Sequence, residues 1–162
     1  MLKINYKKIL IYLFLVAIIF SLDRISKLHV LSLLETNNMI DIYITPFLNL
    51  YLVWNKGIAF GLFSFDENSL YKFITLLITL IILTIFVMMI KTENYKVYFL
   101  ISILGGSLGN LFDRIYYSAV PDFIDFHIKG FHWFVFNVAD IFITLGILCL
   151  IIAEMFPDKF KK

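Results

Sequence analysis

The chain has 162 residues, a formal net charge of +2, 61% hydrophobic residues and a mean hydropathy of +0.90. This length suits one domain, and the apolar share exceeds the roughly 45–50% of soluble domains, which indicates a membrane protein. The single cysteine, Cys149, lies within an apolar run, which excludes a disulfide framework and a thiolate metal site.

Four apolar stretches predict transmembrane helices, because a helix needs about 20 apolar residues to cross the hydrocarbon core of a membrane. They cover about residues 9–28, 69–90, 97–114 and 136–156. Lysines before the first stretch resemble the basic region of a signal peptide. No small-residue cleavage site follows it, so we expect a retained helix. The sequence therefore predicts an all-α integral membrane protein with four transmembrane helices, forming one membrane-embedded domain over residues 1–162.

The basic residues predict how the helices are oriented. Three segments hold most of the lysines: the N-terminal tail, the link between the second and third helices, and the C-terminal tail. With four spans these segments lie on the same side, which the positive-inside rule assigns to the cytoplasm. Both termini are then cytoplasmic, and the segments at about 29–69 and 114–135 lie on the outer side. The lysines are Lys3, Lys7, Lys8, Lys91, Lys96, Lys159, Lys161 and Lys162.

The first outer segment contains a part, about residues 38–64, that is rich in β-branched and aromatic residues and partly alternates apolar with polar types. That composition is typical of short strands, and Pro46 marks a turn or a sheet edge. We therefore expect a small β-rich segment on the outer side, between the first and second helices.

Asp23 and Lys27 lie four residues apart at the outer end of the first helix, so they share one helix face. One interpretation is a structural anchor in which Lys27 extends to the membrane interface. The other is a functional pair that orients the backbone of the outer segment. The sequence leaves both open.

The third helix ends in "LGGSLGNLFDR". Gly105 and Gly109 have the spacing that lets a neighbouring helix approach closely. Asn110 and Arg114 lie one turn apart on one face, next to Asp113. An arginine at membrane depth needs partners, so Asp113 and Arg114 predict a polar cluster that ties helices together. The neutral amide of Asn110 could instead bind a substrate carbonyl.

Acidic residues recur near the outer helix ends. Asp122 follows Pro121 in "VPDFIDF", and Asp140 ends "FNVAD", where Asn137 precedes it by three residues. Asp140 could be structural, because a helix N-terminus stabilises negative charge. If Asp122 and Asp140 converge, they could instead hydrolyse a peptide bond. One ionised carboxylate would take a proton from water while the other, protonated, would donate a hydrogen bond to the scissile carbonyl.

Other chemistries have little support in the sequence. His29, His127 and His132 are scattered and lack a metal-ligand spacing such as H-E-x-x-H, so we expect no metal site. The G-x-S-x-G match at Gly105–Gly109 lies within an apolar helical run and does not support a serine nucleophile. There is no phosphate-binding glycine loop, and the basic residues form no stripe for nucleic acid. We expect neither a cofactor nor a nucleic-acid partner.

Several motifs in the same order resemble the lipoprotein signal peptidase (signal peptidase II) family over nearly the whole chain: "D-x-x-x-K" from Asp23, "NKGIAF" from Asn55, "GGSLGNLFDR", "VPDFIDF" and "FNVAD". The resemblance implies an aspartic endopeptidase of the bacterial inner membrane. Such enzymes remove the signal peptide from diacylglyceryl-modified prolipoproteins by cleaving just before the lipidated cysteine.

The resemblance also implies residue roles. Asp122 and Asp140 match the catalytic pair, with the active site towards the periplasm and the β-rich cradle resting on the membrane above it. The chain departs from the family pattern at Pro121, where an aliphatic residue is usual, and at "YYSAV", where a glycine is usual. We expect a monomer that contacts membrane lipids. The positions matching substrate-binding or supporting residues are Asp23, Lys27, Asn55, Gly57, Asn110, Arg114 and Asn137, with Ala59, Phe60, Gly106 and Ala139 as further motif matches.

Two other function classes are compatible with intramembrane acids. A proton-coupled carrier would place them near the bilayer midplane, whereas here they gather at outer helix ends and no pair of broken helices is evident. A non-enzymatic assembly factor would use the aromatic outer segment as a docking surface, and would stay functional without the acids.

Overall fold

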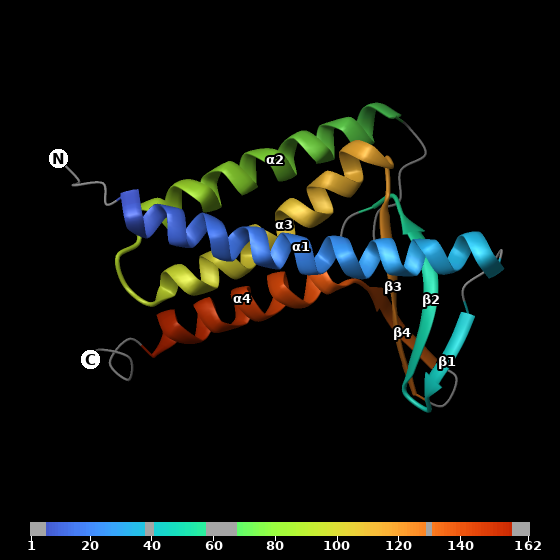
Figure 1. Ribbon diagram of the computed structural model, residues 1–162. Helices are drawn as coiled ribbons and strands as arrows, with labels where there is room; N and C mark the ends of the chain where they lie inside the picture. The colour runs from blue at the N-terminus through green and yellow to red at the C-terminus, as the bar shows by residue number, and fades with distance from the viewer. Residues whose placement is uncertain (1–5, 38–40, 58–67, 129–130, 157–162) are drawn as a thin grey trace.

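The computed structural model describes residues 6–37, 41–57, 68–128 and 131–156. Within these ranges the helices lie alongside one another, and an antiparallel sheet lies at one end of the bundle (Figure 1). α1 begins and α4 ends at the opposite end of the bundle (Figure 1). The elements are α1 (Tyr6–Asn37), β1 (Asp41–Thr45), β2 (Leu48–Asn55), α2 (Asn68–Lys91), α3 (Lys96–Tyr116), β3 (Val120–Ile128), β4 (Phe131–Phe136) and α4 (Val138–Met155).

Three of the described helices are long and apolar enough to cross a membrane: α1 over Tyr6–Leu34, α2 over Ser69–Lys91 and α4 over Val138–Met155. The sequence predicts four spans. α3 differs from the other three because it packs against all of them and buries a polar face. The described structure therefore has three helices that are able to span a membrane, and a fourth span through α3 stays a prediction.

Glycines in α3 allow its close contact with two neighbouring helices. A Cβ atom added to Gly105 would lie 2.7 Å from Ile19 Cβ in α1, and one added to Gly109 would overlap the Asp23 carboxylate. On the other side, a Cβ on Gly106 would lie 2.5 Å from the carbonyl oxygen of Ala139 in α4. The close helix approach predicted from the Gly105–Gly109 spacing is confirmed, and the contact brings Asp23 beside the start of α4.

The sheet has the strand order β1-β2-β3-β4, with antiparallel neighbours. The predicted strands in the first outer segment are present as β1 and β2, and residues 38–40 and 58–64 of that prediction lie outside the described part. The prediction was wrong in confining the cradle to that segment, since β3 and β4 come from the second outer segment. Two acids and Pro121 in β3 obscure the strand pattern, yet Pro121 is tolerated near the first residue of the strand.

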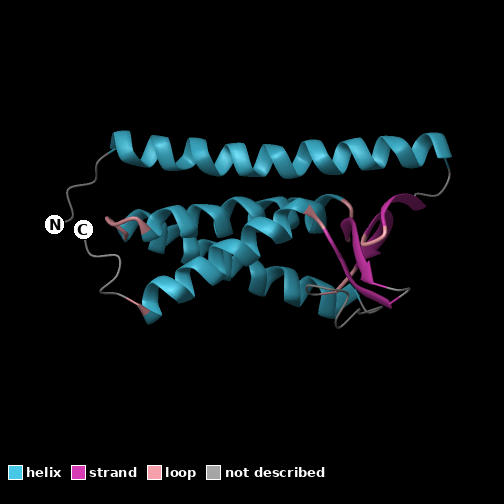
Figure 2. Ribbon diagram, turned by 90° about the horizontal axis from the view of Figure 1, so that it is seen from below, coloured by secondary structure: helices cyan, strands magenta, loops and turns pink. Residues whose placement is uncertain are grey.

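α1 extends to Asn37, well beyond the predicted end near residue 28. Its last turns run past the sheet (Figures 1 and 2). Val30 is buried against Phe123 of β3, in a cluster that also includes Leu33 and Leu50. The last turns of α1 therefore cover the sheet with their apolar side chains.

Candidate active site

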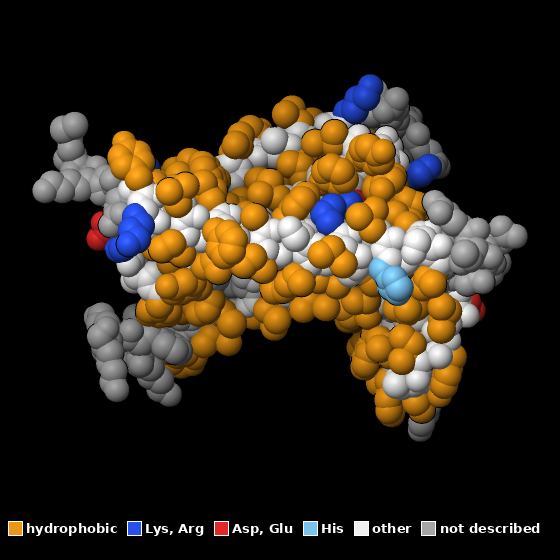
Figure 3. All heavy atoms as spheres, viewed as in Figure 1, with side chains coloured by type: hydrophobic (Ala, Val, Ile, Leu, Met, Phe, Trp, Pro, Cys, Tyr) orange, Lys and Arg blue, Asp and Glu red, His pale blue; other side chains and the backbone are white. Residues whose placement is uncertain are grey.

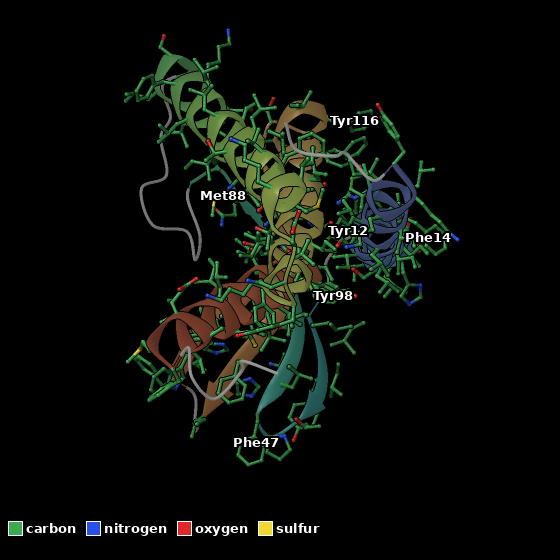
Figure 4. All side chains as sticks on the ribbon, turned by 90° about the vertical axis from the view of Figure 1, so that its left-hand side faces the viewer. Tyr12, Phe14, Phe47, Met88, Tyr98 and Tyr116 are labelled. Carbon is green, nitrogen blue, oxygen red and sulfur yellow. The ribbon has the colours of Figure 1, made fainter. Side chains whose placement is uncertain are left out.

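A cavity of about 500 Å³ lies between α2, α3 and α4, next to β2 and β3. α3 packs against both α2 and α4, whereas the described parts of α2 and α4 are not packed against each other (Figure 4). The side chains that line the cavity form a polar wall and an apolar wall. Its polar lining consists of Asn55, Ser107, Asn110, Arg114, Asp122, Asp140 and Thr144, and its apolar lining of Ile78, Ile81, Val120, Ile143 and Ile147.

Asp122 is held in this cavity by two amides. It lies on β3, is 3% exposed, and sits beside the end of β2 because Val120 pairs with Asn55. Asn55 Nδ2 donates to Asp122 Oδ2 at 2.9 Å, and Asn137 Nδ2 donates to Asp122 Oδ1 at 2.5 Å. Both carboxyl oxygens therefore have a fixed donor, so the sheet and the start of α4 together set the orientation of the group.

Asp140 is fixed by the start of α4. Asn137 caps this helix: its Oδ1 accepts from the Asp140 backbone N–H at 3.1 Å, and its own N–H donates to Asp140 Oδ2 at 3.1 Å. This reciprocal pair is a capping box, and it confirms the interpretation of Asp140 as a capping acid. Asn110 Nδ2 donates to Asp140 Oδ1 at 2.8 Å. A capping role and a place in the cavity thus occur together.

The two acids converge on one site through Asn137. The amide nitrogen of Asn137 binds Asp122, while its amide oxygen and backbone N–H bind Asp140. Burial, and next the nearby charge of Asp140, raise the pKa of Asp122 from its ordinary 3.8 to about 6, although the amides of Asn55 and Asn137 oppose the rise. Two neighbouring carboxyls of this kind favour a state that shares one proton.

The raised pKa of Asp122 predicts a titration near pH 6. Because the folded-state pKa lies above the unfolded value, the protonated carboxyl stabilises the fold below pH 3.8, and this contribution is lost as the pH rises through about 6. Infrared spectroscopy should show a protonated carboxyl signal that disappears near pH 6 and is absent from Asp122→Asn. Asn137→Ala, which removes an opposing donor, should move the midpoint upward. A midpoint near pH 4 in the unsubstituted protein would contradict this assignment.

Lys27 is the centre of a buried charged cluster beside the acids. Its Nζ donates to Asp23 Oδ2 at 2.9 Å, Asn110 Oδ1 at 2.8 Å and Asp113 Oδ2 at 2.6 Å. Arg24 adds an ion pair with Asp113 at 2.6 Å. The expectation that Lys27 extends to the interface was wrong, because its ammonium group is fully buried among these oxygens. The polar cluster expected around Asp113 is confirmed.

Asp23 joins this cluster to α4. Its Oδ1 accepts the backbone N–H of Ala139 at 3.0 Å, at the start of α4. The idea that Asp23 orients backbone is therefore supported, although the backbone belongs to α4 rather than to the first outer segment. Asn110 forms a second link, since its amide oxygen binds Lys27 and its amide nitrogen binds Asp140.

Arg114 binds backbone carbonyls and not Asp113. Its Nη1 donates to the Asn110 carbonyl and its Nη2 to the Gly57 carbonyl, each at 3.2 Å. The Gly57 N–H in turn donates to Asn55 Oδ1 at 2.8 Å. Arg114 thus steadies the chain after β2, where Asn55 contacts Asp122. Ala59 and Phe60 lie outside the described residues.

Sequence reasoning overlooked three polar residues near the site. Arg24 lies next to Asp23 and lacks the four-residue helical spacing that marks Lys27 as a partner of Asp23. Ser107 and Thr144 line the cavity, and isolated hydroxyls in apolar helices carry no pattern that marks them. Helical periodicity from Asn110 and Asp140 would have found both, because Ser107 precedes Asn110 by one turn and Thr144 follows Asp140 by one turn.

Comparison with known proteins adds independent information. Residues 15–156 match the family described as signal peptidase (SPase) II. The lipoprotein signal peptidase of Pelagibacter ubique (strain HTCC1062) is 58% identical, over 98% of this chain and 96% of that protein. That of Anaplasma phagocytophilum (strain HZ) is 39% identical, over 92% and 94%. A solved bacterial membrane enzyme superposes with a TM-score of 0.69 at 26% identity, over 93% of this chain and 92% of that one.

Proposed function

Because the chain belongs to the signal peptidase II family, we propose that it removes the signal peptide from diacylglyceryl-modified prolipoproteins, with Asp122 and Asp140 as the catalytic pair. Cleavage would occur just before the lipidated cysteine, at the outer surface of the bacterial inner membrane. The observation that carries this proposal is the pair of carboxyl groups in one cavity, joined through Asn137, whose side-chain amide donates to Asp122 and whose backbone N–H donates to Asp140.

The chemistry follows from the different surroundings of the two acids. Asp122 holds the shared proton, consistent with its raised pKa. Asp140, at the positive end of a helix and bound by Asn110, is the ionised base. Asp140 takes a proton from water as the water oxygen attacks the scissile carbonyl carbon, and Asp122 protonates the carbonyl oxygen.

The resulting diol then collapses. Asp140 returns its proton to the leaving nitrogen as the C–N bond breaks, and Asp122 regains a proton from one of the two hydroxyls. The products are a carboxylic acid and an amine, and both acids return to their starting states. No step needs a group beyond the two carboxyls and water, which suits a cavity whose polar lining consists of amides, hydroxyls, carboxyls and one guanidinium.

The remaining site residues act through the acids. Asn55 and Asn137 orient Asp122, and Asn110 orients Asp140. Arg114 binds Gly57 and so fixes the chain that carries Asn55. Asp23 binds the first turn of α4, and Lys27 binds Asn110. These are positioning roles, because each residue contacts a catalytic side chain or its backbone support.

A lipid-anchored substrate fits the form of the molecule. The apolar wall of the cavity lies between α2 and α4, which are not packed together in the described residues, so an acyl chain could approach sideways from the bilayer. The sheet has exposed aromatic residues suited to the membrane interface, and Figure 3 shows the apolar surface over it. Phe47 lies at the tip of the β1–β2 turn (Figure 4). The other exposed aromatic residues include Tyr43, Trp54, Phe131 and Trp133.

The orientation proposed from the lysines agrees with this arrangement. α1 begins, the α2–α3 link turns and α4 ends at the end of the bundle away from the sheet (Figure 1). Lys91 and Lys96 flank that link. Both termini would then be cytoplasmic and the sheet periplasmic, in a multi-pass protein of the inner membrane that works as a monomer.

Purified protein mixed with a prolipoprotein provides the test. We expect cleavage when the precursor cysteine carries diacylglycerol and none when the same precursor is unmodified, with the new N-terminus at the cysteine. Equal cleavage of both forms would contradict the substrate, and no cleavage of either would contradict the activity. A carrier would instead produce proton flux in sealed vesicles, and an assembly factor would stay functional after Asp→Asn substitution at both acids.

A further inference from the structure

Three potential metal ligands gather on the β3–β4 hairpin. Asp125 and His127 lie two residues apart on β3, and His132 on β4 pairs directly with His127. Alternate residues of a strand and their cross-strand partner project from the same face of a sheet. The strand pairing therefore brings together residues that look scattered along the chain.

The donor atoms are close enough to share one ion. His132 Nδ1 lies 2.7 Å and His127 Nδ1 lies 3.6 Å from Asp125 Oδ2. A nitrogen or oxygen from each residue lies within 4.8 Å of those from the other two. Ligands bound to tetrahedral zinc at about 2.0–2.2 Å stand roughly 3.3 Å apart, so only small side-chain movements are needed. The two imidazole rings are stacked, with centroids 5.3 Å apart.

Three buried polar atoms at this place in the sheet make no hydrogen bond within the described residues. Asp125 is fully buried and His127 is 9% exposed. Within the described part of the chain, neither Asp125 Oδ1 nor His127 Nδ1 makes a hydrogen bond. Asn49, which pairs with Asp125 from β2, has an Oδ1 in the same condition. Buried polar groups are nearly always partnered, so three exceptions at one place in the sheet need an explanation.

We propose that Asp125, His127 and His132 bind a divalent transition-metal ion of the zinc class. Two imidazoles and one carboxylate match the ligand preference of zinc. The His132 side chain is 58% exposed, so the site is reached from solvent. Because Asn49 pairs with Asp125 on the neighbouring strand, its unpartnered Oδ1 is the candidate for a fourth ligand or for the partner of a metal-bound water. None of the three ligands lines the active-site cavity in the described structure, so this site is separate from the catalytic pair.

The ion would tie β3, which carries Asp122, to β4, which leads into Asn137 and α4. Asp125 follows Asp122 on β3, and His132 precedes Asn137 at the end of β4. A bond from Asp125 through the metal to His132 would fix the hairpin between Asp122 and the residue that binds it. The proposed role is therefore structural, and its test needs no measurement of proteolysis.

Metal binding to the tag-free protein in detergent tests this proposal. Imidazole binds metal in its neutral form, so the titration is done at about pH 8. We expect Zn²⁺ to bind with one ion per chain in calorimetry and to raise the melting temperature, and Co²⁺ to give a visible absorption band. Mg²⁺ should do neither. His132→Ala, at an exposed side chain, should weaken Zn²⁺ binding by about tenfold or more.

Two further variants complete the test. His29→Ala removes an exposed histidine of α1 outside the cluster and should bind Zn²⁺ like the unsubstituted protein. Asp125→Asn should weaken binding as His132→Ala does. Zn²⁺ binding that is absent, or equal in His132→Ala and the unsubstituted protein, or matched by Mg²⁺, would overturn the proposal. The contact between Asp125 and His132 would then serve only to join the two strands.

Discussion

Replacing Asp122 by asparagine is expected to abolish cleavage of a lipidated precursor while the protein stays folded. Asparagine has the shape of aspartic acid but can neither hold the shared proton nor donate it to the scissile carbonyl. Loss of general acid–base catalysis lowers rates by about 10²–10⁴-fold, so kcat/KM should fall towards the upper end of that range. The measurement is the rate of signal-peptide release from a diacylglyceryl-modified precursor, together with a melting curve.

Asp41→Asn is the matched control, because Asp41 is an exposed carboxylate on β1. It should leave both cleavage and melting unchanged. Asp140→Asn should lose cleavage as Asp122→Asn does, since either acid alone is insufficient. Substantial cleavage by either variant would refute the catalytic pair. If a variant loses cleavage and also unfolds, its melting temperature and cleavage rate are compared with those of Asn137→Ala, which keeps both acids.

Replacing Lys27 by methionine is expected to cause the largest loss of stability. The ammonium group is fully buried and binds Asp23 and Asp113 at 2.9 and 2.6 Å. Removing it leaves two buried carboxylates that, among the described residues, pair with Arg24 alone. Breaking a buried ion pair costs about 3–5 kcal/mol. The free energy of unfolding, measured by denaturant titration in detergent, should fall by about this amount. Cleavage should also fall, because Asn110 loses the donor that orients it towards Asp140.

The comparison for this variant is Lys96→Met. Lys96 pairs with Glu154 at 2.6 Å, but the Glu154 side chain is 63% exposed. Exposed pairs contribute about 0–1 kcal/mol, so this change should barely alter stability. Adding Asp113→Asn to Lys27→Met should restore part of the loss, because a neutral amide needs no counter-charge. Equal stability of Lys27→Met and Lys96→Met would show that the buried cluster does not hold the helices together.

The helices and the candidate acids could be predicted from the sequence, because both depend on local properties of the chain. An apolar run long enough to cross a membrane forms a helix there, because its backbone groups must bond to each other where lipid offers no partners. The order of short motifs then led to the signal peptidase II family, and to Asp122 and Asp140. Asn137 and Asp140 were also predictable as neighbours, since three residues make nearly one helical turn. None of these inferences needed contacts between distant parts of the chain.

What only the tertiary structure decided concerns pairings between distant segments. β3 becomes a strand because it pairs with β2, and that pairing places Asn55 beside Asp122. Lys27 is buried because α3 approaches α1 over Gly109, which no property of Lys27 itself reveals. The cluster of Asp125, His127 and His132 likewise exists through the register of β3 and β4. Periodicity describes one element at a time, whereas register and helix approach are properties of two, and the chemistry of this protein lies where its elements meet.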